Sequence, residues 1–247
     1  MGAMNNKKIK QAVILAGGQG MRLRPLTNDR PKPMVLVNGR PFLEYLIDLV
    51  RRNGINEVII LLGYLPEKIT EHFSDGSKFG IKIKYSITDV ADKNGTRIKK
   101  AKHLFDDHFL LLFGDMYSPK MDLAKMLDFY SQMNLPAMMT VYDNHDERGE
   151  YGTKSNVDVS PDGYVTYYAG FCDDLSFKGL DIGSFIFNKK VIDIMPDSDF
   201  SLQAEFLPQL IKRRELAGYI VRDDYHTITT PELVERVKQT FIYEKVN

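Results

Sequence analysis

Apolar and polar positions along the first 142 residues follow the two patterns expected of buried strands and one-sided helices. The apolar run Ala12–Ala16 ends in two glycines, as buried parallel strands often do. Within Pro41–Asn53, apolar residues recur at helical spacing, and Gly54 follows as a helix-ending glycine. The same patterns predict strands at Glu57–Leu62, Lys82–Ile87, Phe109–Phe113 and Ala137–Tyr142, and helices at Glu67–Phe73, Arg97–Phe105 and Asp122–Met133.

Strands and helices that alternate in this way form a doubly wound, mostly parallel sheet of the α/β class. Ligands of such sheets bind outside the carboxyl ends of the strands. Gly17 and Asp115 each come directly after a buried strand. We therefore expect two distant segments to meet at one crevice.

The second half of the chain has a different pattern. It predicts short strands at Asn156–Val159, Tyr164–Tyr168 and Gly183–Phe187, with a turn at 160–163 between the first two. It also predicts helices at Ala204–Arg214 and Glu232–Thr240. We interpret it as a small α+β part that covers one side of the crevice. No linker interrupts the chain, so we expect one domain over residues 9–247, with halves at about 9–142 and 143–247. Residues 1–8 are interpreted as a tag remnant and a flexible N-terminus, with Met4 as the native start.

Composition excludes several classes of protein. Of the 247 residues 43% are hydrophobic, and 33 Lys and Arg balance 33 Asp and Glu, so the net charge is zero. Nothing in this balance indicates binding to nucleic acid or to a membrane. The single Cys172 excludes a disulfide framework and a four-cysteine zinc site. Without a long apolar run or a leader pattern, we expect a cytoplasmic protein.

The segment after the first strand carries the candidate chemistry. It reads GGQGMRLRPLT from Gly17 to Thr27, followed by RPKP at 30–33. Its glycines let backbone N–H groups approach an anion, while Arg22 and Lys32 add positive charge. It is not a Walker A loop, because no Gly-Lys-Ser/Thr follows the glycines. It is not a dinucleotide fingerprint either, because Leu23 stands where the third glycine belongs. We expect a phosphate-binding loop; a glycine-rich turn with solvated cations is the alternative.

Asp115 ends the most apolar strand, in a Gly-Asp pair. A carboxylate in that position suits Mg²⁺, which takes one or two carboxylates together with phosphate oxygens. The alternative is an aspartate that caps the next element. A phosphate-binding loop nearby favours the metal.

Together these residues resemble a known family. The pattern LAGGxGxRLxPLT from Leu15 to Thr27, with the PKP at 31–33, closely resembles the sugar-1-phosphate nucleotidyltransferases. Phe109–Asp115 is similar to their strand and metal aspartate, and Tyr225–Glu232 to their closing segment, so the resemblance covers about residues 9–240. It implies a Rossmann-like nucleotidyltransferase fold, and conversion of a sugar 1-phosphate and an NTP into an NDP-sugar and pyrophosphate, with Mg²⁺ as cofactor.

The resemblance also implies roles for individual residues. Arg22 would hold the β- and γ-phosphates, Lys32 would contact the α-phosphate, and Asp115 would hold the metal ion. The NTP would lie against Leu15, Ala16, Gly17, Gly18, Gly20, Met21, Arg22, Lys32 and Gly95. The sugar would lie against Tyr151, Gly152, Asp181, Gly183 and Glu205, residue types that ordinary turns and helix faces also use.

Three departures concern the phosphate and metal positions. Met21 stands where the family usually has threonine. The family's Glu-Lys-Pro is replaced by a Tyr-Ala-Gly at 168–170, so its phosphate-binding lysine is missing unless Lys178 substitutes. The closing segment reads TITTP at 227–231 and lacks the second metal aspartate. The candidates to compensate for it are Asp181, Asp223 and Asp224.

A fourth departure concerns the base. The stretch from Gly95 to Lys100 is more similar to glucose-1-phosphate cytidylyltransferases than to the usual family pattern, and we expect Arg97 to reach a phosphate or the sugar.

Three classes of function are compared. The leading hypothesis is an active enzyme for surface polysaccharide biosynthesis, with D-glycero-D-manno-heptose 1-phosphate guanylyltransferase as the best guess and cytidylyl transfer to a hexose phosphate next. The missing lysine and aspartate keep open a regulatory protein that binds nucleotide sugars with weak catalysis. A dinucleotide oxidoreductase is disfavoured by the absent third glycine. The sequence does not identify the base or the sugar, and a homo-oligomer is compatible with it.

Overall fold

The structure, a computed structural model, describes residues 8–144, 155–169 and 178–246. Its helices are α1 (Phe42–Arg52), α2 (Glu67–Phe73), α3 (Asn94–Lys100), α4 (Leu123–Met133), α5 (Leu207–Lys212) and α6 (Pro231–Val246). Its strands are β1 (Gln11–Leu15), β2 (Leu36–Val37), β3 (Arg40–Pro41), β4 (Glu57–Leu62), β5 (Lys82–Ile87), β6 (His108–Phe113), β7 (Met116–Tyr117), β8 (Ala137–Asp143), β9 (Val157–Val159), β10 (Val165–Tyr168), β11 (Gly179–Asn188), β12 (Leu216–Val221) and β13 (His226–Thr227).

One central sheet connects the two halves of the chain. Among the described residues it has nine strands, with β10-β9-β11-β6-β1-β4-β5 in order; β8 pairs with β11, and β12 pairs with β8. The pairs β6–β1, β1–β4 and β4–β5 are parallel, as the alternating pattern predicts. Strand β11 is antiparallel to β6 and to β8, so the second half extends the same sheet. The expected α/β class with a mostly parallel sheet is confirmed.

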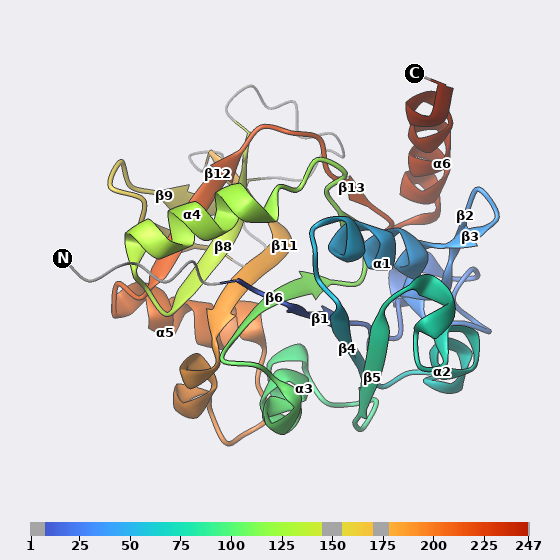
Figure 1. The fold of residues 1–247 in the computed structure, drawn as a ribbon, viewed down its shortest axis with the longest axis horizontal. Coiled ribbons are helices and arrows are strands. Elements are labelled where there is room, and N and C mark those ends of the chain that lie inside the picture. The colour runs from blue at the N-terminus through green and yellow to red at the C-terminus, as the bar shows by residue number, and fades with distance from the viewer. Residues whose placement is uncertain (1–7, 145–154, 170–177, 247) are drawn as a thin grey trace.

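Helices cover both faces of the sheet, as Figure 1 shows, with α1 and α4 on one side and α3 and α5 on the other. The sheet can bury both faces because its strands are apolar at consecutive positions. In β1, Ala12 and Ile14 pack with α1 and α4, whereas Val13 packs with α3 and α5. Because both faces are buried, the register of β1 and β6 is fixed, and their carboxyl ends, Leu15 and Phe113, lie side by side.

Three predicted helices have clearly different bounds in the structure, among them the one predicted over Glu232–Thr240, which is α6 and extends to Val246. Helix α3 begins at Asn94, three residues before the predicted start, and a 3₁₀ turn over Lys102–Leu104 replaces its predicted end. The helix predicted over Ala204–Arg214 begins as a π-turn, Leu202–Phe206, and continues as α5. Pro208 has no N–H to donate to the carbonyl four residues earlier, which favours the wider turn before it.

The pattern missed β12 and underestimated β11. Gly218 interrupts the apolar run of β12, because the Val159 side chain packs where a Cβ would lie, 2.6 Å away. Strand β11 is ten residues long, and its pairing with β8 is irregular between Asp181 and Phe185. Such an irregularity bends a strand and redirects its side chains. Here it follows the buried Asp181.

Candidate active site

The glycine-rich loop begins where β1 leaves the sheet. The Leu15 carbonyl accepts a hydrogen bond from Gly114 N at 2.9 Å, which joins the ends of β1 and β6. Tyr64 N donates to the Gly17 carbonyl at 3.1 Å and ties the loop to the segment after β4. Gly18 is exposed, and a Cβ at this position would meet nothing within 4 Å. The backbone at Gly18 is therefore accessible to a ligand.

Gly20 fixes the turn of the loop. Its φ of +63° is in the left-handed region, and a Cβ there would lie 3.0 Å from Lys32 Cβ. Thr27 Oγ1 donates to the Gly20 carbonyl at 2.9 Å. The loop then forms a short 3₁₀ turn over Met21–Leu23, in which Met21 and Arg22 are exposed. Arg22 is thus exposed in the turn that follows Gly20, and it is not among the residues that line the pocket described below.

Lys32 and Asp115 meet beneath this loop. Lys32 begins a 3₁₀ turn that packs beside Gly20, and its ammonium group forms an ion pair with Asp115 Oδ2. The Lys32 and Asp115 side chains are only 14% and 27% exposed, so water screens this pair less than it screens a surface pair. The lysine and the aspartate that the sequence placed after different strands are in direct contact.

The closing segment completes this cluster. Strand β13 pairs with β7, and Ile228 N donates to the Asp115 carbonyl at 3.2 Å. Thr229 Oγ1 lies 3.4 Å from the Lys32 ammonium nitrogen and 2.9 Å from Thr227 Oγ1. Two threonine hydroxyls therefore lie where the resemblance would supply a second aspartate.

Asp181 lies nearby in a buried position on β11. Its carboxylate accepts hydrogen bonds from Gly183 N at 2.8 Å and from the Tyr168 hydroxyl at 2.9 Å. Burial raises the pKa of Asp181 to about 6, these two hydrogen bonds lower it, and the negative charge of Asp115 raises it further. Burial dominates because the ionised carboxylate loses its hydration.

Replacing Asp181 by asparagine is expected to change how stability depends on pH. The folded pKa of about 6 exceeds the usual value of about 4. Ionisation therefore destabilises the wild type increasingly from about pH 4 to pH 6, and the penalty is constant above that range. Asp181→Asn keeps an acceptor for Gly183 N and removes the charge. In urea unfolding, its stability relative to wild type should rise by roughly 2–3 kcal/mol between these pH values; a pH-independent difference would contradict the assignment.

Arg97 has a structural position that the sequence analysis did not foresee. Its guanidinium is 3% exposed and donates to the Leu62 carbonyl at 2.8 Å and to Thr88 Oγ1 at 2.6 Å. It lies so close to the backbone that a Cβ on Gly17 would come within 2.7 Å of Arg97 Cζ. The expectation that Arg97 reaches a phosphate or the sugar is wrong, because its N–H groups bind the end of β4 and the loop after β5.

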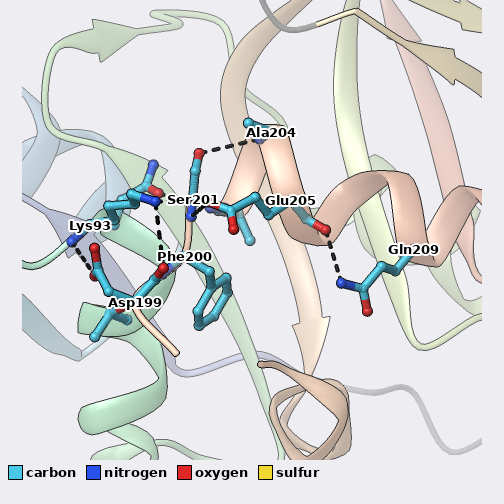
Figure 2. Close-up of polar contacts among 10 residues, drawn as sticks. Lys93, Asp199, Phe200, Ser201, Ala204, Glu205 and Gln209 are labelled. Carbon is cyan, nitrogen blue, oxygen red and sulfur yellow. Dashed lines mark hydrogen bonds and ion pairs between the residues drawn. The ribbon is translucent and has the colours of Figure 1, made fainter. Parts of the chain in front are cut away.

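Glu205 belongs to a set of contacts that joins α3 to the π-turn, and Figure 2 shows how these residues approach one another. Glu205 Oε1 accepts from Ser201 N at 2.9 Å and from the Lys93 ammonium at 3.1 Å. Asp199 accepts from Lys93 N at 2.8 Å. The Glu205 carboxylate thus acts in the manner of a capping box. In the same region, Gly95 is packed against the Phe200 ring.

A pocket of about 220 Å³ lies between these groups. The end of β1, the loop, the Lys32 turn and the end of β6 form most of its wall, and Asn94 and Gln203 complete it. Asn94 Nδ2 donates to Gln203 Oε1 at 2.6 Å. Neither amide was predicted as a site residue, because no sequence motif includes them and because their pairing depends on the π-turn. The pocket is lined by Leu15, Ala16, Gly18, Gly20, Lys32, Pro33, Asn94, Phe113, Gly114, Asp115 and Gln203.

Several predicted residues lie elsewhere. Tyr151, Gly152 and Cys172 fall outside the described residues. Lys178 is exposed at the start of β11. Asp223 and Asp224 are exposed just before β13, and Asp223 faces Lys120 at 3.8 Å. Of the three aspartates considered as second carboxylates, only Asp181 is buried and within electrostatic reach of Asp115.

The residues fit a divalent ion that is held mainly by its substrate. Within residues 8–144, 155–169 and 178–246, no three His, Cys, Asp or Glu side chains cluster as an all-protein metal site would require. Asp115 offers one carboxylate, and its Oδ1 is not used in the ion pair with Lys32. Mg²⁺ commonly binds through one or two carboxylates with phosphates and water as the remaining ligands.

Most of the chain is similar to known proteins. The family described as Nucleotidyl transferase matches residues 11–227. Mannose-1-phosphate guanylyltransferase of Mycobacterium tuberculosis is 31% identical over 90% of this chain, which spans only 61% of that relative's length. D-glycero-alpha-D-manno-heptose 1-phosphate guanylyltransferase of Campylobacter jejuni is 31% identical over 90% of this chain and 96% of its own length.

A solved structure, that of HddC from Yersinia pseudotuberculosis, superposes with a TM-score of 0.78 at 24% identity, covering 94% of this chain and all of HddC. At that identity the likeness shows the fold alone. Members of the family generally use divalent metal ions. In the described part of the chain, every helix is too short or too polar to span a membrane.

Proposed function

We propose, from the premise that the chain belongs to the nucleotidyl transferase family, that it transfers a nucleotidyl group from an NTP to a sugar 1-phosphate and releases pyrophosphate. The observation that carries the proposal is the contact of Lys32 with Asp115 beneath the glycine-rich loop, at the carboxyl ends of two adjacent parallel strands. A cation, a carboxylate and accessible backbone groups surround one pocket, which supports the proposal.

The chemistry requires positioning and charge neutralisation, and it requires no protein nucleophile. A phosphate oxygen of the sugar 1-phosphate attacks the α-phosphorus of the NTP, and the bond from that phosphorus to the bridging oxygen of pyrophosphate breaks. Lys32 would neutralise charge that builds up on the α-phosphate, and the exposed Arg22 would bind the leaving pyrophosphate. Asp115 would hold Mg²⁺, which when bound supplies further neutralisation of the phosphates.

The loop backbone would bind the nucleotide. Leu15, Ala16, Gly18 and Gly20 line the pocket, and we propose that their main-chain groups contact the nucleotide together with the neighbouring Gly17 and Met21. Gly95 does not line the pocket, because it is buried against Phe200, so its role would be to let α3 begin close to that ring. On the sugar side we propose Asp181 and Gly183 together with Tyr151 and Gly152. Glu205 acts there through Lys93 and the π-turn, because its carboxylate oxygen is used in those contacts.

For the substrates, we propose D-glycero-D-manno-heptose 1-phosphate and GTP, in surface polysaccharide biosynthesis. Support comes from the heptose 1-phosphate guanylyltransferase relative, whose length this chain nearly matches. A glucose-1-phosphate cytidylyltransferase is the second candidate, because the segment from Gly95 to Lys100 is similar to that group in sequence.

The test is a substrate matrix. Purified protein with Mg²⁺ is incubated with each of GTP, CTP, UTP, dTTP and ATP against a panel of sugar 1-phosphates, and pyrophosphate release is measured. We expect release with one preferred pair and none with the sugar 1-phosphate omitted. Retained NTP binding without release from any pair would instead indicate a regulatory binding protein.

A further inference from the structure

The wall of the pocket opposite the loop consists of two neutral amides. Among the described residues that line the pocket, Gln203 is the one contributed by the second half of the chain. Asn94 lies beside it at the start of α3, and all the other lining residues belong to the end of β1, the loop, the Lys32 turn or the end of β6. Gln203 is thus in position to contact the part of a ligand that extends away from the loop.

Hydrogen bonds fix the orientation of both amides. Asn94 Oδ1 accepts from Leu202 N at 2.9 Å, so Asn94 Nδ2 is the group that donates to Gln203 Oε1 at 2.6 Å. With its oxygen so engaged, Gln203 directs its N–H₂ group to the Tyr168 hydroxyl, and this hydrogen bond lowers the pKa of Tyr168 against the raising effect of burial. An amide nitrogen has two N–H groups, which leaves one for a ligand.

The same contacts lead from Gln203 to the carboxylates. The Tyr168 hydroxyl donates to Asp181 Oδ2, and the negative charge of Asp115 raises the pKa of Asp181. A ligand at this end of the pocket meets the N–H₂ group of Gln203, while Asp115 in the same lining is paired with Lys32. An uncharged amide donor suits a hydroxyl group of a sugar ring.

The π-turn that carries Gln203 is unusual. Leu207 N donates to the Leu202 carbonyl, five residues earlier, and Phe206 N donates to the Ser201 carbonyl at 3.3 Å. Such wide turns are uncommon and occur often at functional sites. Here the turn is held by Lys93 and Asp199, as Figure 2 shows, so the position of Gln203 is set before a ligand arrives.

We propose that Gln203, oriented by Asn94, is a specificity-determining residue that hydrogen-bonds a hydroxyl of the sugar ring and discriminates between sugar 1-phosphates by that hydroxyl. This inference rests on the proposed function, since it names the sugar hydroxyl as the part of the substrate that the same pocket recognises.

The test compares Gln203→Leu with wild type on the preferred sugar 1-phosphate, its epimers and its single-deoxy analogues. We expect the KM for the sugar 1-phosphate to rise about tenfold and the discrimination against one deoxy analogue to fall by a similar factor. The KM for the NTP should stay within about twofold. Gln203→Glu keeps an acceptor for Asn94 but loses the donor, and it should show the same loss of discrimination even if the leucine variant folds poorly.

Gln209→Leu is the matched control. It removes an exposed amide from α5, where Gln209 Nε2 donates to the Glu205 carbonyl at 3.0 Å outside the pocket lining. Its discrimination should equal that of wild type. Unchanged discrimination in both Gln203 variants, or a rise in both KM values with discrimination intact, would overturn the inference while leaving the transferase proposal standing. A wild type that converts no pair would overturn the proposed function itself.

Discussion

Asp115→Asn is expected to lower kcat by roughly a thousandfold, because it removes the carboxylate that would hold the metal ion against the phosphates. Asparagine keeps the shape of the side chain, and the carboxylate it replaces is 27% exposed. The variant leaves Lys32, whose side chain is 14% exposed, without its partner, so the free energy of unfolding should fall by roughly 1–3 kcal/mol. Steady-state pyrophosphate release and urea unfolding measure the two effects.

Asp197→Asn is the control for this variant. Asp197 is fully exposed and pairs with Lys99 at 2.6 Å, away from the pocket. It loses an ion pair of the same chemical type, and its kcat should match wild type. A rate near wild type in Asp115→Asn at saturating Mg²⁺ would rule out the metal-binding role of this aspartate.

Lys32→Met is expected to reduce kcat by about a hundredfold to a thousandfold, the range found when one charge-stabilising donor is lost. Methionine preserves the apolar stem that packs beside Gly20. The loss should therefore appear mainly in kcat, with a cost in stability of about 1 kcal/mol for leaving Asp115 without its partner.

A surface lysine provides the comparison. Lys125 is 73% exposed and pairs with Asp122 at 3.2 Å, so Lys125→Met removes an ammonium group without touching the pocket. Its kcat should be unchanged. If Lys32→Met lowered kcat by no more than threefold, the cation beneath the loop would have no role in the transfer.

Local pattern was sufficient to predict that the glycine-rich loop and Asp115 lie together. Gly17 and Asp115 each end an apolar strand, and parallel strands bring such ends to one edge. The contact between Lys32 and Asp115 follows from that placement and from a turn that begins directly at Lys32. These features depend on short stretches of chain, so the sequence contains them almost completely.

The other wall depends on long-range packing. Asn94 and Gln203 are 109 residues apart, and their hydrogen bond needs the π-turn before α5. Arg97 looked like a ligand-binding cation because its charge is visible in sequence, whereas the Leu62 carbonyl and Thr88 that bind it are not. Neither the amide pair nor the burial of Arg97 follows from any local pattern.

The most direct test follows the phosphorus atoms. Phosphorus NMR of a reaction with Mg²⁺, the preferred NTP and its sugar 1-phosphate should show a nucleoside diphosphate sugar and pyrophosphate in equal amounts, and Asp115→Asn should show neither. Formation of nucleoside diphosphate and orthophosphate would place the cleavage at the γ-phosphate and contradict the account.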